Sequence, residues 1–214
     1  MEIINRIKKT FPNLALFTLS VELEKILKNC DSVLDVGCGN NSPLNLLDHK
    51  IYMVGVDGYN ESINESKKRR IHNKYYLMNV LNINKKFKKR SFDAVVALDI
   101  IEHLTKKDGF KLLDMMQKIA RKKVVVLTPN GFIAQGGEEN GFQEHLSGWN
   151  IEDFIKCGYM VSGEYGLKKI RGEKAALLYT PKIFWGLISV LSHLIFTRKN
   201  PKYAFSLLCF KNLS

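Results

Sequence analysis

The sequence predicts one α/β domain in which a mostly parallel sheet is covered by helices on both faces. The first observation is that short, continuously apolar runs alternate with amphipathic stretches at helical spacing. Strands that are buried on both faces of a parallel sheet have this continuous apolar character. The second observation is size, since 214 residues with 45% hydrophobic and 25% charged side chains suit one large globular domain. We therefore expect a single domain over residues 1–214.

Seven segments have the composition of strands. The first, SVLDV, runs into Gly37, and the second, IYMVGV, ends at Asp57. The fifth, KVVVL, is stopped by Thr128 and Pro129. We expect strands at residues 32–36, 51–56, 75–78, 92–98, 123–127, 159–167 and 203–210.

Helical stretches separate these strands. Apolar residues recur at helical spacing in VELEKIL, and Asn150 is a suitable N-cap for a helix that Gly158 would close. We expect helices at residues 21–27, 43–47, 61–70, 108–120 and 151–156. Residues 168–201 lie between the last two strands and are basic at both ends but apolar in the middle.

The chain is strongly basic, with a net charge of +12. Lysines and arginines gather at residues 67–70, 85–90, 121–123 and 168–171. Such a charge attracts nucleic acids, anionic lipids and anionic small molecules. Because these clusters lie far apart in the sequence, the simpler interpretation is a solvated, lysine-rich surface.

Composition also excludes several classes of protein. The four cysteines are scattered and form no CxxC pair, so neither a disulfide framework nor a zinc motif is expected. The first residues carry charges and lack a long apolar segment, which argues against a secretory signal. A membrane span needs an apolar run of about 18 residues, and the nearest approach, at residues 183–196, is shorter. We expect a cytoplasmic protein.

The strongest motif is VLDVGCGN at residues 33–40. A buried strand here runs into Gly37 and Gly39, and glycines let the backbone turn sharply and a ligand come close. Ligands bind at the carboxyl ends of the strands in an open parallel sheet. Asp57, at the end of the second strand, is placed to accept the ribose hydroxyls of an adenosine. The motif predicts a nucleoside site, and a tight turn without a ligand is the alternative.

With these residues the chain resembles the class I S-adenosylmethionine-dependent methyltransferases over about residues 30–210. The resemblance rests on VLDVGCG at 33–39, VGVD at 54–57, SFDAV at 91–95 and DIIEHL at 99–104. It implies a Rossmann-like, seven-stranded, mostly parallel sheet with an antiparallel last strand. It further implies that residues 168–201 form a helical insertion or cap before that strand. The cofactor would be S-adenosylmethionine and the reaction methyl transfer.

The resemblance also assigns the cofactor-binding residues. The glycine loop lines the methionine part, and Asp57 holds the ribose. The family usually has an acid after the third strand, where this chain has Asn79, whose amide can still accept from and donate to an adenine. The implied set is Asp35, Gly37, Cys38, Gly39, Asp57, Gly58, Asn79, Val80 and Asp99.

A dinucleotide site is the rival interpretation of the glycine motif. It needs a third glycine, in the pattern G-x-G-x-x-G, where the chain faces a pyrophosphate. Residues 37–42 read GCGNNS, with Ser42 at that position. S-adenosylmethionine has no pyrophosphate, so the sequence favours it over NAD.

Two histidines are candidates for a catalytic base. His103 follows the fourth strand, and His145 lies in the glycine-rich loop 130–148, which we expect to close over the acceptor. Either imidazole can titrate near neutral pH and take a proton from a hydroxyl, although both can instead be structural. Glu144 and His145 are adjacent, but without further ligands they make no metal site, so no metal is expected.

The expected acceptor is a hydroxyl of a small or lipid-linked molecule, less readily an amine or a carbon. Amino-directed nucleic-acid enzymes carry [DN]-P-P-[FY] where residues 99–102 read DIIE, and no Pro-Cys nucleophile occurs. The pattern HLxxW at residues 145–149 resembles methyltransferases related to quinone and polysaccharide clusters. A basic RNA-directed methyltransferase and a non-catalytic S-adenosylmethionine-binding protein stay open as alternatives.

The predicted insertion contains the most apolar segment of the chain. Residues 183–196 read IFWGLISVLSHLIF, which is apolar nearly all round and needs cover from protein, partner or lipid. We expect a cap over an apolar acceptor, or an interfacial helix whose Lys182, Arg198 and Lys199 give a peripheral membrane contact.

Overall fold

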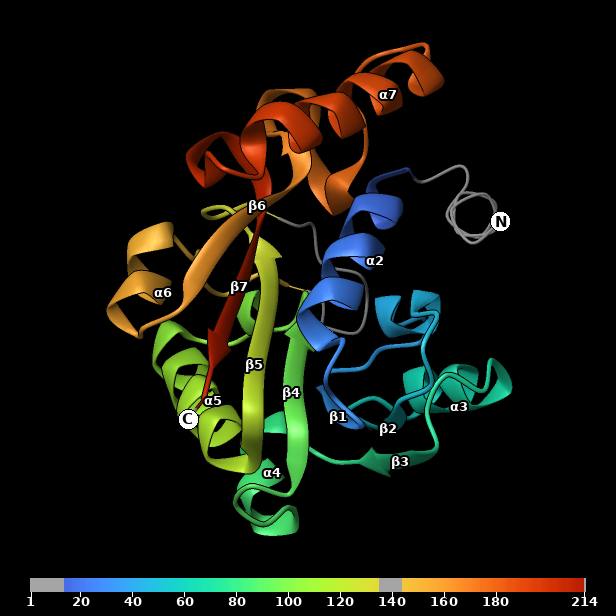
Figure 1. The fold of residues 1–214 in the computed structure, drawn as a ribbon, viewed down its shortest axis with the longest axis vertical. Coiled ribbons are helices and arrows are strands. Elements are labelled where there is room, and N and C mark those ends of the chain that lie inside the picture. The colour runs from blue at the N-terminus through green and yellow to red at the C-terminus, as the bar shows by residue number, and fades with distance from the viewer. Residues whose placement is uncertain (1–13, 135–143, 214) are drawn as a thin grey trace.

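The computed structural model describes residues 14–134 and 144–213, and it contains one sheet in the order β3-β2-β1-β4-β5-β7-β6 (Figure 1). The pairs from β3 to β5 are parallel, and β7 is antiparallel to both β5 and β6. The predicted fold class is confirmed, including the antiparallel last strand. The strands are β1 (Ser32–Val36), β2 (Tyr52–Asp57), β3 (Lys74–Leu77), β4 (Phe92–Leu98), β5 (Ala120–Pro129), β6 (Met160–Leu167) and β7 (Ala204–Asn212).

The sheet is buried on both faces. In β4, Val95 and Ala97 belong to one hydrophobic cluster, whereas Ala94 and Val96 belong to another. Successive side chains of a strand point to opposite faces, so the two clusters cover the two faces. Every residue of β4 is buried, which explains why its sequence is apolar except for Asp93.

Helices on the two sides of the sheet complete the two hydrophobic clusters. Leu112 and Met116 of α5 pack on one face, and Leu19 and Leu23 of α2 pack on the other. The α-helices are α2 (Leu14–Leu27), α3 (Asn60–Lys68), α4 (Ile83–Lys86), α5 (Lys106–Ile119), α6 (Ile151–Lys156) and α7 (Lys182–Ser192). Short 3-10 turns are η1 (Pro43–Leu46), η2 (Val80–Asn82), η3 (Ile101–His103), η4 (Lys168–Ile170), η5 (Glu173–Ala175) and η7 (Pro201–Tyr203), and η6 (His193–Thr197) is π-helical.

Two helices differ from their predicted form. The predicted helix at residues 43–47 is only the 3-10 turn η1, which begins where the Ser42 hydroxyl accepts from the amide of Leu44. The helix predicted at residues 21–27 begins earlier, at Leu14, because the apolar spacing extends towards the N-terminus and includes the buried Leu19. The α6 helix has the predicted bounds, and Asn150 and Asp153 form a capping box at its start.

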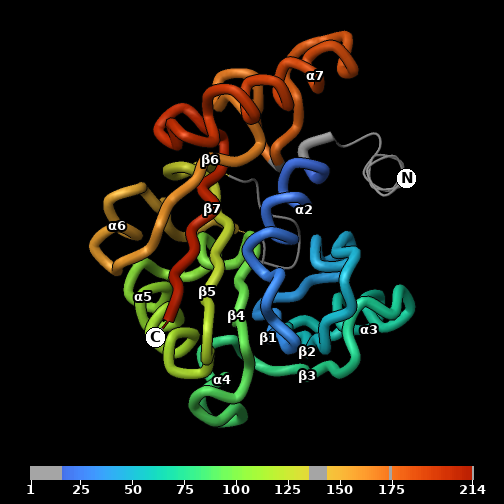
Figure 2. The backbone as a smooth tube through the Cα atoms, viewed as in Figure 1, coloured from blue at the N-terminus to red at the C-terminus, as the bar shows by residue number. Residues whose placement is uncertain are grey.

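The insertion at residues 168–201 is largely helical, as predicted, and rises from the edge of the sheet where β5 ends. Leu167 pairs with Ala204, and Pro129 pairs with Ser206 two residues further along β7. Figure 2 shows α7 lying across this end of the sheet. Within the described residues, none of the helices combines the length and hydropathy that crossing a membrane requires.

Candidate active site

The glycine loop, which contains Gly37 and Gly39, directly follows β1. Gly37 and Gly39 have left-handed φ angles of +72° and +56°, which favour glycine. The amide of Gly37 donates to the carbonyl of Val56 at 2.8 Å, so the loop is fixed to β2. A Cβ on Gly37 would lie 2.5 Å from Cγ1 of Ile100, whereas a Cβ on Gly39 would meet nothing within 4 Å. The loop therefore leaves open space beside the half-buried Gly39 and no room for a side chain at Gly37.

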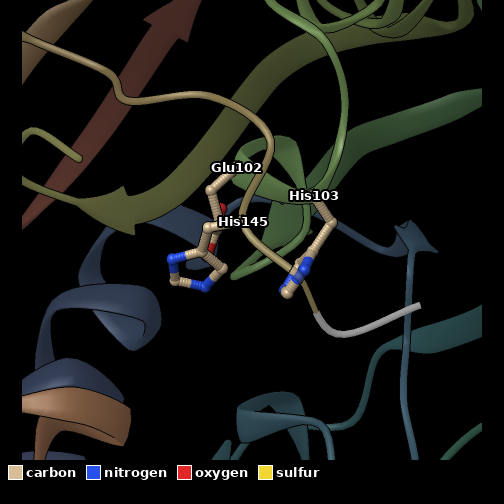
Figure 3. A group of neighbouring side chains, drawn as sticks. All are labelled: Glu102, His103 and His145. Carbon is tan, nitrogen blue, oxygen red and sulfur yellow. The ribbon is translucent and has the colours of Figure 1, made fainter. Parts of the chain in front are cut away.

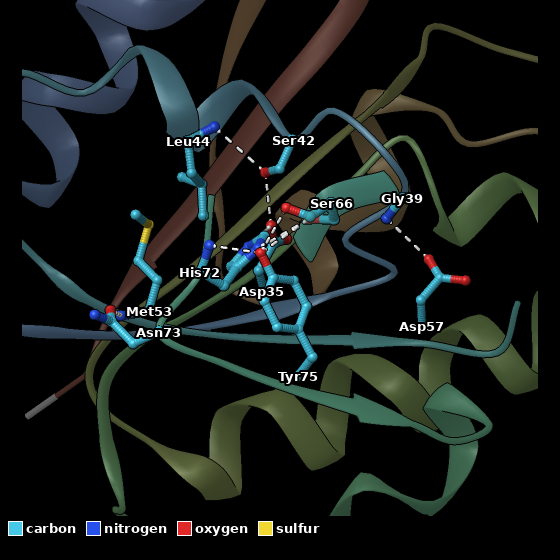
Figure 4. Close-up of polar contacts among 10 residues, drawn as sticks. All are labelled: Asp35, Gly39, Ser42, Leu44, Met53, Asp57, Ser66, His72, Asn73 and Tyr75. Carbon is cyan, nitrogen blue, oxygen red and sulfur yellow. Dashed lines mark hydrogen bonds and ion pairs between the residues drawn. The ribbon is translucent and has the colours of Figure 1, made fainter. Parts of the chain in front are cut away.

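Asp57 joins the end of β2 to this loop (Figure 4). Its Oδ2 accepts from the amide of Gly39 at 2.8 Å, and its Oδ1 accepts from the amide of Tyr59 at 2.8 Å. A carboxylate has about four lone-pair sites, so both oxygens keep capacity for the ribose hydroxyls. The predicted ribose residue lies beside the glycine loop, as the assignment requires.

Asp35 lies beneath the loop, with a side chain that is 1% exposed. The Ser42 hydroxyl donates to Asp35 Oδ2 at 2.6 Å, and Nε2 of His72 lies 2.9 Å from the same oxygen (Figure 4). The carboxylate thus ties the loop after β1 to the segment before β3. Its predicted contact with the methionine part of a cofactor stays a prediction, and these bonds give it a supporting role in the loop.

Cys38 is buried in the same loop. Burial, with smaller contributions from the Asp35 and Asp57 charges, raises the pKa of the Cys38 thiol far above its ordinary value. The thiol is therefore protonated at neutral pH and unsuited to act as a nucleophile.

Asn79 and Val80 follow β3. The Asn79 side-chain oxygen accepts from the amide of Leu81 at 2.8 Å, which caps η2. This contact leaves the exposed amide nitrogen of Asn79 able to donate to an adenine ring nitrogen. Val80 is buried in the hydrophobic cluster below, so its side chain supports the turn.

Glu102, His103 and His145 form a compact cluster beyond β4 and β5 (Figure 3). One ligand atom from each of the three residues lies within 4.8 Å of the others. The Thr128 hydroxyl, near the end of β5, donates to Oε2 of the buried Glu102 at 3.0 Å. Burial raises the pKa of Glu102 well above its ordinary value, and the nearby Asp99 charge raises it further.

Backbone carbonyls fix the orientation of both imidazoles. Nδ1 of His103 lies 3.1 Å from the carbonyl oxygen of Glu144, and Nδ1 of His145 lies 2.7 Å from that of Ile133. A carbonyl only accepts, so each Nδ1 carries the proton, and in the neutral ring the lone pair is on Nε2. Burial lowers the pKa of His103 below its ordinary value, which favours its neutral form.

Backbone and side-chain hydrogen bonds hold the segment that carries His145 in place. The amides of Leu146 and Ser147 donate to the carbonyl of Glu102 at 2.8 and 3.0 Å. Trp149 is fully buried, and its Nε1 donates to the Ser147 hydroxyl at 3.0 Å. The loop that we expect to close over the acceptor spans residues 130–148, of which 135–143 lie outside the described residues. Residues 144–149 have a defined place beside η3.

The cluster differs from the predicted site in one respect. Sequence reasoning paired His145 with Glu144 and found no metal ligands, whereas the structure brings His145 to Glu102 and His103. Two imidazoles and a carboxylate suit divalent cations such as Zn²⁺ or Mn²⁺. Metal-binding histidines commonly donate their other ring nitrogen to a carbonyl, as both rings can here. Glu102 was missed because only the fold brings η3 to the segment after β5.

Asp99 lies next to this cluster. It follows β4 directly, is exposed and has a left-handed φ of +53°. Asp99 lies at the same edge of the sheet as the glycine loop, which suits its predicted contact with the cofactor. This contact stays a prediction.

Comparison with known proteins agrees with the sheet order and the glycine loop. Residues 34–134 match a family described as a methyltransferase domain. The chain is 25% identical over 169 residues to a small RNA 2′-O-methyltransferase of Tetrahymena thermophila. That alignment covers 66% of this chain and 40% of the Tetrahymena protein, so the chain spans less than half of the length of that relative.

Two solved structures have the same fold. A SAM-dependent methyltransferase from Archaeoglobus fulgidus has a TM-score of 0.61 at 16% identity, covering 92% of this chain and 94% of its own. Magnesium protoporphyrin IX methyltransferase from Synechocystis PCC 6803, solved with bound SAM, has a TM-score of 0.54 at 12% identity, covering 94% of this chain and 79% of its own. The family match over residues 34–134, the glycine loop and the strand order show that the chain contains a methyltransferase domain with the fold of the S-adenosylmethionine-dependent methyltransferases, for which S-adenosylmethionine is the cofactor.

Proposed function

We propose that the protein transfers the methyl group of S-adenosylmethionine to a hydroxyl oxygen of a small or lipid-linked molecule. The observation that carries this proposal is the cluster of Glu102, His103 and His145 at the ends of β4 and β5. In the reaction the bond from sulfur to the methyl carbon breaks, a bond from oxygen to carbon forms, and the hydroxyl proton leaves. A group that takes this proton accelerates the transfer by about 10²–10⁴-fold.

The two imidazoles suit this step. Each has its Nδ1 bonded to a carbonyl, so the lone pair of Nε2 is available to the acceptor hydroxyl. His145 is buried and lies edge to face against His103 with ring centroids 4.8 Å apart. An amine acceptor that arrives unprotonated has less need of such a base, so the cluster favours a hydroxyl.

The same three residues fit a divalent cation. Glu102 would supply a carboxylate oxygen, and His103 and His145 would each supply Nε2. Such an ion lowers the pKa of a hydroxyl or water that it binds. In both cases the cluster serves to deprotonate a hydroxyl, and removal of divalent ions distinguishes the two arrangements.

A ribose 2′-hydroxyl of RNA is the second candidate acceptor. The Tetrahymena relative is named as a small RNA 2′-O-methyltransferase, and this chain has a net charge of +12. Against it, α7 of the insertion carries one exposed cation, Lys182 at its start, and otherwise exposes apolar side chains. This composition favours an acceptor with an apolar part.

The test is transfer of a labelled methyl group from S-adenosylmethionine to three acceptor fractions: small polyhydroxyl and phenolic compounds, lipid-linked glycans and quinols, and short RNA. We expect transfer to one of the first two fractions, with the label stable as a methyl ether. Transfer to RNA alone would replace the proposed acceptor with the second candidate. Binding of S-adenosylhomocysteine without transfer to any fraction would favour a non-catalytic binding protein.

A further inference from the structure

The helical insertion turns its apolar side away from the protein. The side chains of α7 and η6 that face the body are small or polar, and Gly186, Ser189, His193 and Thr197 are buried there. Apolar side chains occupy the exposed side at helical spacing. They are Ile183, Phe184, Leu187, Leu191, Leu194 and Ile195, which we call the apolar face. Helices that face water have the reverse arrangement, with polar residues outside.

Close contacts with β6 fix this orientation. A Cβ on Gly163 would lie 2.2 Å from the carbonyl oxygen of Thr197, and one on Gly166 would lie 2.3 Å from that of Ser189. The helix backbone therefore lies directly against the glycines of β6. The Ser189 hydroxyl donates to the carbonyl of Tyr165 at 2.8 Å and accepts from the buried Arg171 at 2.7 Å. Rotating the helix to bury its apolar face would break these contacts.

The side chains of the apolar face are well exposed, and aromatic side chains lie at both of its ends. Ile195 is 77% exposed and Ile183 is 65% exposed. Aromatic side chains flank it at both ends, since Tyr179 contacts Trp185 and Tyr203 contacts Phe196. An exposed apolar surface of this kind marks a site of interaction with a protein or a membrane.

Charge decides between these partners. Residues 182–203 contain no acidic side chain, whereas Lys182 precedes the apolar face and Lys199 and Lys202 follow it, all three exposed. A second copy of this chain would bring another net charge of +12 towards the same cations, which opposes association. A bilayer with anionic headgroups attracts them, and aromatic side chains are enriched at membrane interfaces.

We propose that α7 and η6 form a docking surface for an anionic lipid bilayer, with the helix lying along the interface. The apolar face would enter the boundary between headgroups and acyl chains, and the flanking lysines would contact the headgroups. The insertion rises beside the end of β5, so docking would bring the active-site edge to the membrane. A lipid-linked acceptor would then be delivered to the site, a consequence that rests on the proposed function, whereas docking itself does not.

The experiment is co-sedimentation of the full chain with vesicles. Phosphatidylcholine vesicles are compared with vesicles that contain about 30% phosphatidylglycerol, at about 50 and 500 mM salt. We expect binding to the anionic vesicles that weakens with salt. The double variant Leu191→Glu/Ile195→Glu should weaken it at least about tenfold, because both changes place charge on the surface that enters the lipid. Ile155→Glu, at an exposed apolar position of α6, is the matched control and should bind as the parent does.

Two results would overturn the proposal. One is a parent protein that binds neither type of vesicle. The other is a parent dimer in sedimentation equilibrium that Leu191→Glu/Ile195→Glu converts to monomer without any vesicle binding, which would assign the apolar face to a second copy of the chain. Binding of S-adenosylhomocysteine is measured on the same preparations. A protein that binds this ligand but no vesicles contradicts docking alone and leaves the proposed methyl transfer to its own test.

Discussion

His103 and His145 lie edge to face with their ring centroids 4.8 Å apart, although one follows β4 and the other follows β5. Each gives its Nδ1 proton to a backbone carbonyl, which leaves the lone pair on Nε2, and one ring nitrogen of each histidine lies within 4.8 Å of a carboxylate oxygen of the buried Glu102. The end of the sheet thus combines the predicted nucleoside-binding loop with a cluster whose residue types can take a proton or bind a cation. This combination suits methyl transfer to a hydroxyl.

Replacing His145 tests the cluster directly. We expect His145→Gln to lower turnover by about 10²–10⁴-fold, because the acceptor proton loses its route to Nε2 or to a bound cation. The affinity for S-adenosylhomocysteine, measured by calorimetry, should stay near that of the parent, since the glycine loop and Asp57 are untouched. Leu146→Gln changes the exposed neighbour and is the control. Parent-like turnover of His145→Gln between about pH 6 and 9 would remove this residue from the mechanism.

Divalent ions separate the two arrangements of the cluster. If the three residues hold a cation, EDTA should abolish transfer, and Mn²⁺ or Zn²⁺ should restore it. The variant Glu102→Gln should then require a higher ion concentration, because it replaces a charged ligand with a neutral one. Transfer that is indifferent to EDTA would leave His103 and His145 as bases without a metal. Ion binding can be followed independently by calorimetry in the absence of acceptor.

Asp57→Ala should weaken cofactor binding. The change removes the acceptor for the amides of Gly39 and Tyr59 and the predicted partner of the ribose hydroxyls. A lost charge-assisted contact corresponds to roughly 1.5–3 kcal/mol. Calorimetry with S-adenosylhomocysteine gives the measurement, and Glu61→Ala at an exposed acid of α3 is the control. Unchanged affinity in Asp57→Ala would show that the ribose assignment is wrong.

Gly37→Val should abolish cofactor binding. A Cβ at this position would lie 2.5 Å from Cγ1 of Ile100, and the φ of +72° strains any side chain. Gly37→Ala gives a graded comparison, because it shares the strain but adds less volume. Thermal unfolding of both variants shows whether the damage is confined to the loop. Parent-like binding of S-adenosylhomocysteine by Gly37→Val would contradict the described loop geometry.

Glu164 makes stability depend on pH. It lies in β6, where Thr18 donates to Oε2 at 3.2 Å and Nε2 of His193 lies 3.7 Å from Oε1. Burial, followed by the nearby Glu22 charge and opposed by the Thr18 bond and Arg198, raises the pKa of Glu164 from 4.5 to about 8. The folded state therefore binds this proton more tightly than the unfolded chain. The contribution is fully present below about pH 4.5 and is lost as the pH rises through about 8.

Glu164→Gln removes this titration while keeping the shape of the side chain. We expect its melting temperature to change less than that of the parent between pH 4.5 and 8. At the upper end of that window the variant should be more stable than the parent by roughly 1–3 kcal/mol, which corresponds to a few degrees. Glu152→Gln, at an exposed acid of α6, should follow the parent. Parallel pH profiles for Glu164→Gln and the parent would show that Glu164 is charged in the folded protein.

The sequence alone determined the sheet and the position of the glycine loop, because these depend on short stretches of chain. The residues of β1 and β4 are buried on both faces, so their apolar runs mark the strands at their observed bounds. Gly37 and Gly39 could be recognised from the sequence because a left-handed turn after a strand favours glycine. Asp57 could be assigned because the end of β2 lies beside the end of β1 in any sheet of this order.

Only the tertiary structure decided which distant residues meet and which side of a helix faces water. Glu102 joins His103 and His145 because the carbonyl of Glu102 accepts from the amides of Leu146 and Ser147, a pairing that no local pattern encodes. Residues 183–196 read as apolar nearly all round, so the sequence could not tell their buried side from their exposed side. The orientation of this helix follows from the close approach of α7 and η6 to Gly163 and Gly166. Only small or polar side chains fit against those glycines, so the apolar side chains lie on the exposed side.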